Sequence, residues 1–244
     1  MGAVSETAKG AYASALCLAG FPWLAYRMAR HADGCAPARQ MMADHARRFL
    51  DRCDVAIEME GQPLPKGFGC VVSYNEPSFI DVAAFAAVMW PYVDRAAAAE
   101  FYGYFPFAKE ALANAQIGLV TRGKRAGTDG LLTEMVSHAR SGARIAWGGE
   151  GRIAGFDGIG HYKIGGSLLA IRAQVPVVPV AFYGGHQVMP FRTIRARPGT
   201  VRILFGDPIQ TEGLSESDAR ALADRVKAVM VEMYAGLKAR AGQF

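Results

Sequence analysis

Two carboxylates lie close together in the short stretch Asn75-Glu-Pro-Ser-Phe-Ile-Asp81. Glu76 and Asp81 are five positions apart, and carboxylates so placed can accept a proton from a reacting group and return it. If the two side chains face each other, like-charge repulsion and partial burial raise the pKa of one of them, and the pair titrates as a unit. A plainer interpretation also fits, since asparagine, proline and serine favour turns and Asp81 suits the first turn of a helix.

The residues on either side place this stretch between a strand and a helix. Residues 69–74 form an apolar run typical of a buried strand, and residues 82–90 have the composition of a buried helix. Proteins of the α/β class carry their chemistry where a strand ends and a helix begins. We therefore expect Glu76 and Asp81 at the carboxyl end of a strand.

Strand-like and helix-like segments alternate through the rest of the chain. Further strands are predicted at 117–121, 143–147, 175–182 and 200–205, and helices at 129–141, 168–173 and about 215–241. This alternation predicts an α/β fold with a mixed β-sheet flanked by helices. Because the chain has 244 residues, 51% of them hydrophobic, and no long linker, we expect residues 55–244 to form one structural unit.

Residues 1–54 differ in character and predict an N-terminal helix pair. Residues 11–26 are almost all apolar or small and lead into Arg27 and Arg30. The run is shorter than the roughly 20 residues of a membrane span and contains Pro22, so a helix lying in the membrane interface fits better. A helix packed against the core fits about as well. Residues 37–52 predict a second, amphipathic helix.

Composition narrows the kinds of partner. The formal net charge of +5 and the pI near 9.1 suit an anionic membrane, an anionic substrate or nucleic acid. Nucleic acid is the least supported, because the basic residues are spread through helices and no nucleic-acid-binding motif occurs. No metal site or disulfide framework is expected, because no Cys-x-x-Cys pair or histidine at ligand spacing accompanies the four cysteines, Cys17, Cys35, Cys53 and Cys70.

Four blocks of sequence resemble, in order, those of the glycerolipid acyltransferase family. Asn75–Asp81 stands where the family has Asn-His-x-Ser-x-x-Asp, and Gly118–Arg122 resembles a block that ends in arginine. Gly148–Arg152 resembles the block Phe-Pro-Glu-Gly-Thr-Arg, and Val175–Pro179 resembles the proline-bearing fourth block. Between the last two, Tyr162–Gly165 resembles the family's lysine-glycine step.

The resemblance implies transfer of a fatty acyl group from a thioester to an acceptor. The donor would be acyl-coenzyme A or acyl carrier protein, as a co-substrate and with no further cofactor or metal. The acceptor would be a lysophospholipid-like molecule, or another lipid or small molecule, at the membrane surface. The protein would be cytoplasmic and peripheral on the inner face of the membrane. The resemblance further implies catalytic roles for Glu76 and Asp81, and substrate-binding roles for Asn75, Ser78, Arg122, Glu150, Gly151 and Arg152.

The chain departs from the family in two of the blocks. Glu76 replaces the histidine that takes a proton from the acceptor hydroxyl. A carboxylate with an ordinary pKa of about 4.3 is a weaker base than an imidazole with a pKa of about 6.5. Arg152 comes one position earlier than the family's arginine, and Gly148 and Gly149 replace Phe-Pro.

These departures leave two functions open. An acyltransferase with Glu76 as base would suit an amine acceptor, because the nitrogen carries an acidic proton once it has attacked the thioester. The alternative is a disabled relative that binds acyl chains or a partner. His161 and His186 are candidates for a substitute base. The remaining histidines, His31, His45 and His138, are expected to be surface or packing residues.

Overall fold

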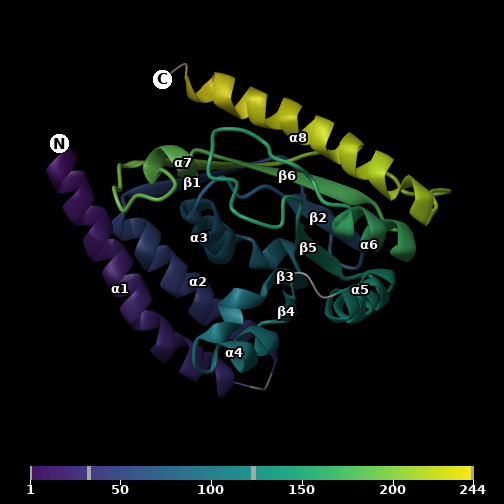
Figure 1. The fold of residues 1–244 in the computed structure, drawn as a ribbon, viewed down its shortest axis with the longest axis horizontal. Helices are drawn as coiled ribbons and strands as arrows, with labels where there is room; N and C mark the ends of the chain where they lie inside the picture. Colours follow the sequence, from purple (N-terminus) through teal and green to yellow (C-terminus); the bar gives the residue numbers. More distant parts are fainter. Residues whose placement is uncertain (1, 32–33, 122–124, 243–244) are drawn as a thin grey trace.

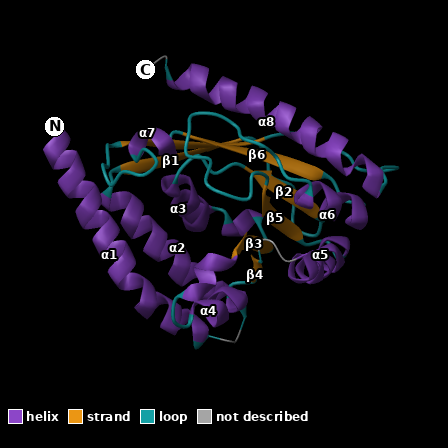
Figure 2. Cartoon of the chain, viewed as in Figure 1, coloured by secondary structure: helices purple, strands orange, loops and turns teal. Residues whose placement is uncertain are grey.

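The computed structural model describes residues 2–31, 34–121 and 125–242, with the side chains of residues 125–127 outside that description. A seven-stranded sheet in the order β1-β7-β6-β2-β5-β3-β4 forms its centre (Figures 1 and 2). The strands are β1 (Val55–Glu60), β2 (Cys70–Tyr74), β3 (Arg95–Ala99), β4 (Ile117–Val120), β5 (Arg144–Gly148), β6 (Val177–Tyr183) and β7 (Gly199–Phe205). The helices are α1 (Ala3–Ala29), α2 (Cys35–Arg52), α3 (Phe79–Val88), α4 (Ala108–Asn114), α5 (Arg125–Arg140), α6 (Gly165–Ala173), α7 (Gly185–Val188) and α8 (Ala219–Ala241). Short 3₁₀ turns cover Trp90–Tyr92, Glu100–Tyr104 and Glu216–Asp218.

The sheet is mixed, as predicted. Neighbouring strands are parallel except β6 and β7, which are antiparallel. Strand β2 lies at the centre, where Tyr74 pairs with Gly148 of β5 and Val180 of β6. Because parallel strands end at the same edge of a sheet, the segments that follow β2, β5 and β6 meet there.

Helices cover both faces of the sheet. Residues of α1, α2, α3 and α4 share one hydrophobic cluster with one face, and residues of α5, α6 and α8 share another with the opposite face. Figure 1 shows α8 running along the sheet on the side away from α1, α2 and α3. All five residues of β2 are buried, which agrees with its mostly apolar sequence.

The predicted strands and helices downstream of residue 69 are all present, with shifted ends. Helix α3 begins three residues earlier than predicted, since Ser78 caps it and Phe79 is its first residue. Strand β3 was not predicted, because its sequence Arg-Ala-Ala-Ala-Ala has low strand propensity. Pairing with β4 and β5 on either side overrides that propensity.

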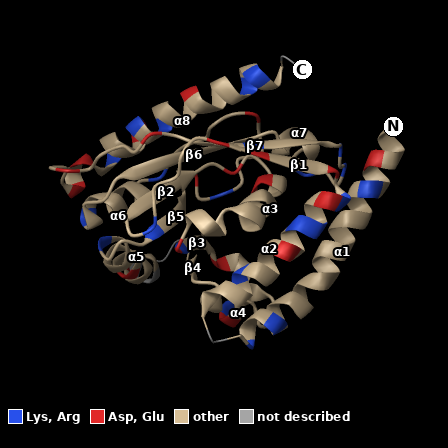
Figure 3. Cartoon of the chain, turned by 180° about the vertical axis from the view of Figure 1, so that it is seen from behind, with Lys and Arg blue, Asp and Glu red and all other residues tan. Residues whose placement is uncertain are grey.

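The N-terminal helix pair is present and packs against the rest of the molecule. Leu24 and Met28 of α1 and Phe49 of α2 are buried in the cluster that covers the sheet. Helix α1 also leaves large apolar side chains exposed, among them Leu18 and Trp23 at 62% and 64%. Figure 3 shows few charged residues along α1, in contrast to α2. None of the helices in the described ranges is long and apolar enough to cross a membrane.

Candidate active site

The block Asn75–Asp81 forms the turn from β2 into α3, as the sequence predicts. Asn75 fastens the start of this turn to the neighbouring strand: its side-chain amide donates to the Phe182 carbonyl at 3.0 Å and accepts from the Phe182 N–H at 2.8 Å. Asn75 is buried, and its polar atoms are engaged by β6. The structure therefore gives this predicted binding residue a scaffolding contact.

Ser78 and Asp81 form a capping box at the start of α3. Asp81 Oδ2 accepts hydrogen bonds from the Ser78 N–H and hydroxyl, both at 2.8 Å, and Ser78 Oγ accepts from the Ile80 N–H at 3.2 Å. Such a box satisfies amide groups that the first helical turn would otherwise leave without partners. Both side chains are 1% exposed. Asp81 thus occupies the first helical turn that its position predicted.

The Asp81 carboxyl is enclosed by α7. Burial raises its pKa to about 7, against the opposing effect of hydrogen bonding from Ser78 and the Gly185 amide. Its second oxygen, Oδ1, makes no hydrogen bond of ordinary geometry to a described residue. A Cβ atom at position 185 would lie 2.4 Å from both carboxyl oxygens, so only glycine permits this approach. The raised pKa comes from enclosure, and Asp81 makes no hydrogen bond to Glu76.

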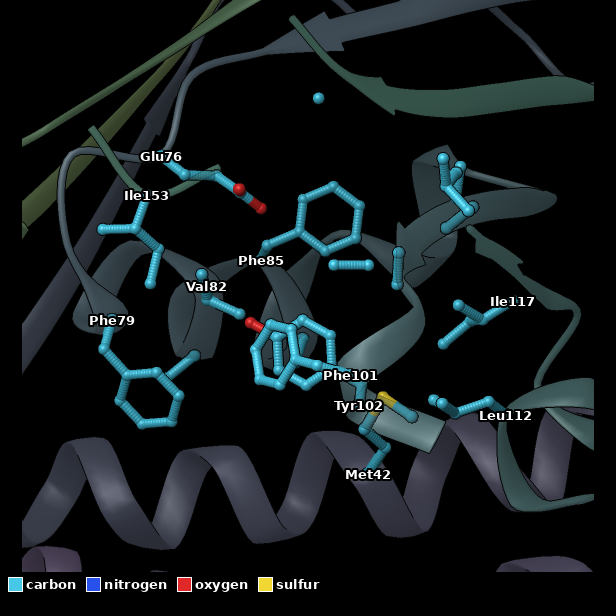
Figure 4. Close-up of a pocket in the computed structure, with 18 of the residues that line it drawn as sticks. Met42, Glu76, Phe79, Val82, Phe85, Phe101, Tyr102, Leu112, Ile117 and Ile153 are labelled. Atoms are coloured by element: carbon cyan, nitrogen blue, oxygen red, sulfur yellow. The ribbon is translucent and has the colours of Figure 1, made fainter. Parts of the chain in front are cut away.

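Glu76, in contrast, points into a large apolar cavity of about 780 Å³. Figure 4 shows its carboxylate directed toward Phe85, with Leu112 and Ile117 at the far end of the group of lining side chains. The Tyr74 hydroxyl donates a hydrogen bond to Glu76, and burial, followed by the charge of Glu76, raises the Tyr74 pKa well above its usual value. Glu76 is therefore the predicted catalytic residue that can meet a ligand directly.

The cavity wall combines the sheet edge with the N-terminal helices. Apolar side chains of α1, α2 and α4 line it, including Phe21, Leu24, Met42, Phe49 and Leu112. On the opposite side the wall contains the four alanines of β3, whose small side chains leave room for the cavity. A volume of this size is typical of sites that enclose most of a small ligand.

The glycine-rich segment after β5 runs along the Glu76 turn. Its Ala154 and Gly155 amides donate to the carbonyls of Glu76 and Pro77 at 2.8 and 3.1 Å. The Glu150 carboxylate is 5% exposed and accepts from the Gly160 N–H, closing the segment into a loop. Burial raises the Glu150 pKa, partly opposed by hydrogen bonding from the Gly160 and Glu76 amides. Glu150 thus closes the loop, and the Ala154 and Gly155 amides join the loop to the turn.

Position 149, where the chain departs from the family block, requires glycine because of its neighbours. A Cβ atom there would lie 2.3 Å from the ring of Tyr162, which is buried against β5. The Lys163 amide also donates to the Gly149 carbonyl at 2.9 Å. The residues that resemble the lysine-glycine step therefore lie directly beside the glycine-rich loop.

Two cations mark the mouth of the cavity. Arg152 and Lys163 are exposed and line it together with Gly151, where a Cβ atom would lie 3.3 Å from Lys163 Nζ. Arg152 therefore reaches the site despite its shift by one position. Lys163 was absent from the predicted site residues, although the Tyr162–Gly165 resemblance was a signal for it. Arg122 lies outside the described residues, and Thr121 before it lines the cavity.

Neither candidate for a substitute base lines the cavity. His161 is exposed, and His186 of α7 is directed to Asp157 and Tyr234. The histidine on the cavity wall is His45, whose Nε2 lies 3.4 Å from the Cys17 sulfur between α1 and α2. Burial lowers the His45 pKa and raises that of Cys17. Among the described residues no cluster of three metal-ligating side chains occurs, and all four cysteines are free.

Comparison with known proteins points to one family. The sequence is 34% identical to human 1-acyl-sn-glycerol-3-phosphate acyltransferase alpha over 73 residues, which are 30% of this chain. The matched segment is 26% of the human protein, so this chain spans about a quarter of that protein's length. It is 28% identical over 170 residues to the putative 1-acyl-sn-glycerol-3-phosphate acyltransferase acl-2 of Caenorhabditis elegans, covering 67% of this chain and 58% of that protein. No family model matches the chain.

The fold also matches a solved structure over nearly the whole chain. The crystal structure of the 1-acyl-sn-glycerophosphate (LPA) acyltransferase PlsC from Thermotoga maritima superimposes with a TM-score of 0.71 at 19% identity, covering 97% of this chain and 96% of that one. The predicted mixed sheet with an N-terminal helix pair is therefore also found in that protein. Together the comparisons confirm the resemblance to the glycerolipid acyltransferases, in sequence and in fold.

Proposed function

We propose that this chain, a relative of the glycerolipid acyltransferases, transfers a fatty acyl group from a thioester to an acceptor at the membrane surface. One observation carries the proposal: the Glu76 carboxylate faces an apolar cavity of about 780 Å³, with the cations Arg152 and Lys163 at its mouth. The apolar wall suits an acyl chain, and the cations suit a phosphate of the donor or the acceptor. Acyl-coenzyme A and acyl carrier protein both present such a phosphate and a thioester.

The chemical step needs one base. The acceptor oxygen or nitrogen attacks the thioester carbonyl, Glu76 takes the proton from the attacking atom, the carbon–sulfur bond breaks, and the proton passes to the departing thiolate. Asp81 supports this step from behind, since its capping box holds the turn that carries Glu76. In this proposal Glu76 is the catalytic residue and Asp81 a positioning residue.

The acceptor follows from the strength of the base. The relatives named above act, by their names, on 1-acylglycerol-3-phosphate, which makes a lysophospholipid the first acceptor to test. A carboxylate is a weak base for an alcohol but suffices for an amine, whose nitrogen becomes acidic after attack. An amine-bearing lipid or a specialised lipid hydroxyl is therefore the second class of acceptor.

A release assay for free thiol tests the proposal. Purified protein receives acyl-coenzyme A or acyl carrier protein donors of several chain lengths, with lysophosphatidic acid or amine-bearing acceptors, and mass spectrometry identifies the products. We expect acceptor-dependent thiol release that requires Glu76. Absence of transfer to every acceptor, together with transfer by the Glu76→His variant, would show that the chain has lost catalysis.

One observation favours the alternative, a protein that has lost catalysis. The Tyr74 hydroxyl donates to Glu76, and one carboxyl oxygen of Asp81 accepts both hydrogen bonds from Ser78. With these hydrogen bonds in place, Glu76 could have a structural role alone, as part of the wall that encloses a bound acyl chain or a partner's lipid. Tight binding of fatty acids without thiol release would support this alternative.

We further propose that the protein binds peripherally to the inner, cytoplasmic face of the membrane through the aromatic end of α1. Trp23, Tyr104 and Phe107 are 64%, 72% and 51% exposed, and the ring centroids of Tyr26 and Phe107 lie 5.3 Å apart. The exposed Arg30 donates to the Tyr26 hydroxyl at 2.9 Å. Aromatic rings beside arginines favour the headgroup region of an anionic membrane, where a lipid acceptor would enter.

A further inference from the structure

Four polar side chains from three separate segments meet behind the Asp81 carboxyl. Asp157 comes from the loop after β5, His186 from α7, and Tyr234 and Lys238 from α8. The Tyr234 hydroxyl donates to Asp157 Oδ1 at 2.9 Å, and Lys238 Nζ donates to Asp157 Oδ2 at 2.6 Å. His186 lies between them, with Nε2 3.5 Å from Asp157 Oδ1 and Nδ1 3.5 Å from the Tyr234 hydroxyl.

Each group in this cluster has a defined protonation state at neutral pH. Burial alone would raise the Asp157 pKa, but hydrogen bonds from Lys238 and Tyr234 outweigh it and lower the pKa. Burial lowers the His186 pKa, partly opposed by Asp157, so the imidazole is neutral. Burial, together with the hydrogen bond to Asp157, raises the Tyr234 pKa and keeps its hydroxyl protonated. The cluster is therefore an Asp157–Lys238 ion pair with two neutral donors beside it.

Two of these segments reach the reactive turn. Gly185, next to His186, packs directly on the Asp81 carboxyl, where even a Cβ atom would lie 2.4 Å away. The loop that carries Asp157 also donates the Ala154 and Gly155 amides to the turn at Glu76 and Pro77. Tyr234 of α8 contacts both segments, through Asp157 of the loop and His186 of α7. Helix α8 itself lies far along the chain from the four blocks that resemble the family.

We propose that Tyr234 and Asp157 are positioning residues for acyl transfer, because they tie α7 and the glycine-rich loop to α8 and so hold the enclosure of Asp81 and the turn of Glu76. This inference rests on the proposed acyl transfer. A displacement of about 1 Å in a reactive arrangement is enough to lower a rate about 100-fold. Tyr234 makes ring contact with Tyr183 as well, at 5.1 Å between centroids, so removal of its hydroxyl alone leaves the packing of α8 in place.

The Tyr234→Phe and Asp157→Asn variants test the proposal. We expect each to lower kcat by about 10-fold or more while KM for the donor changes little. Release of α7 would admit water to Asp81, whose pKa is raised by burial, so its titration should move to lower pH. The groups that face Asp81 are Ser78, the N-cap of α3, the Gly185 amide on α7 and Tyr234 on α8.

A matched control comes from the last turn of α8, just beyond Lys238. Arg240 pairs with Glu60 of β1, so Arg240→Gln removes a polar contact of α8 that does not involve Asp157. We expect this control to keep both the turnover and the pH profile of the wild type. Thermal melting of all variants separates loss of folding from loss of positioning.

Carboxyl-labelled aspartate followed by ¹³C NMR reads the Asp81 titration directly, without any turnover, once Asp81→Asn has assigned the signal. If the wild type transfers no acyl group but the titration moves in Tyr234→Phe, the proposed function fails and the positioning role stands. If both cluster variants keep the wild-type titration and turnover within about twofold, or lose only melting temperature, the inference is overturned.

Discussion

The two walls of the cavity are built in different ways. The wall that carries Glu76 is held by hydrogen bonds between buried polar groups, from Asn75 to β6, from Asp81 to Ser78 and from Glu150 to its loop. The wall formed by α1 and α2 is held by apolar packing, with His45 and Cys17 as a polar pair within it. Hydrogen bonds fix the direction in which polar side chains point, whereas apolar packing depends on the volumes of the side chains. Substitutions in the first wall should therefore change chemistry, and those in the second should change which acyl chain fits.

The largest effect is expected at Glu76. In the proposed reaction Glu76→Gln keeps the shape and removes the base, and we expect acyl transfer to fall about 100-fold or more. Binding of a fatty acid in the cavity should persist, because the apolar wall is unchanged. Thiol release and fatty-acid binding measured on the same preparation separate the two properties.

Glu134→Gln provides the matched control, since Glu134 is an exposed glutamate on α5 that pairs with Arg95. We expect the Glu134→Gln variant to transfer acyl groups at the wild-type rate. Unchanged transfer in Glu76→Gln would remove Glu76 from the mechanism and would erase the contrast between the two walls.

A second prediction concerns the close approach of α7 to Asp81. Gly185→Ala places a methyl group where only 2.4 Å separates it from the carboxyl oxygens. We expect activity to fall about 10-fold and the free energy of unfolding to fall by about 1–3 kcal/mol, the usual cost of overpacking. Gly236→Ala is the control, because an added Cβ at this α8 glycine would lie within 4 Å of no atom beyond its chain neighbours and the backbone of its own helix, and alanine favours a helix. Equal stability of the two variants would contradict the tight enclosure.

The apolar wall gives the third prediction. Ala111 of α4 is 2% exposed and lines the cavity, so Ala111→Leu fills part of its volume. We expect the ratio of kcat/KM for long over short acyl donors to fall about 10-fold, with short donors little affected, since one methylene in an apolar pocket changes selectivity by about 10-fold or more. A competition assay with mixed donors, read by mass spectrometry, measures the ratio directly. A uniform loss for all chain lengths would place Ala111 outside the chain-binding part of the cavity.

The contrast between the walls also explains what the sequence could predict. The strand–turn–helix around Asp81 is local, and the Ser-x-x-Asp spacing is itself a capping signal, so its place was predictable. Strand β3 was not, because four alanines carry no strand signal and their position depends on β4 and β5. The partners of Asn75 and Asp157, Phe182 and Tyr234, are distant in sequence and follow only from the folded sheet.

For the site, the resemblance located the glycine-rich loop but not the contacts that its residues make. Glu150 stays a predicted substrate-binding residue, and its hydrogen bond from the Gly160 N–H, ten residues away, could not be predicted from the sequence. The pairing of Cys17 with His45 had no sequence signal, since it depends on how α1 crosses α2. Gly20 permits that crossing, because a Cβ atom there would lie 3.0 Å from the imidazole.

A smaller effect is expected for membrane binding through α1. Trp23→Glu places a negative charge among the exposed aromatic residues of the proposed docking surface. We expect recovery with anionic vesicles in flotation to fall severalfold, and raised salt to weaken the wild type further. Val231→Glu, at a 45% exposed position on α8, serves as the control. Deletion of α1 is a poorer test, because its buried residues line the cavity and the whole site would be disturbed. Equal flotation of both variants with the wild type would refute the proposed surface.

The smallest effect, a shift of several degrees in melting temperature, is expected from the titration of Asp81. Its folded-state pKa of about 7 lies above the ordinary value, so the folded protein holds the proton more tightly than the unfolded chain does. The stability from this group is fully present below the unfolded pKa of about 3.9 and is lost as the pH rises toward about 7. Asp81→Asn removes the titration while an amide oxygen can still accept from Ser78. The melting temperature of the wild type relative to that of Asp81→Asn should therefore decrease between pH 5 and pH 8, and parallel curves would show that Asp81 is not held in the enclosure described above.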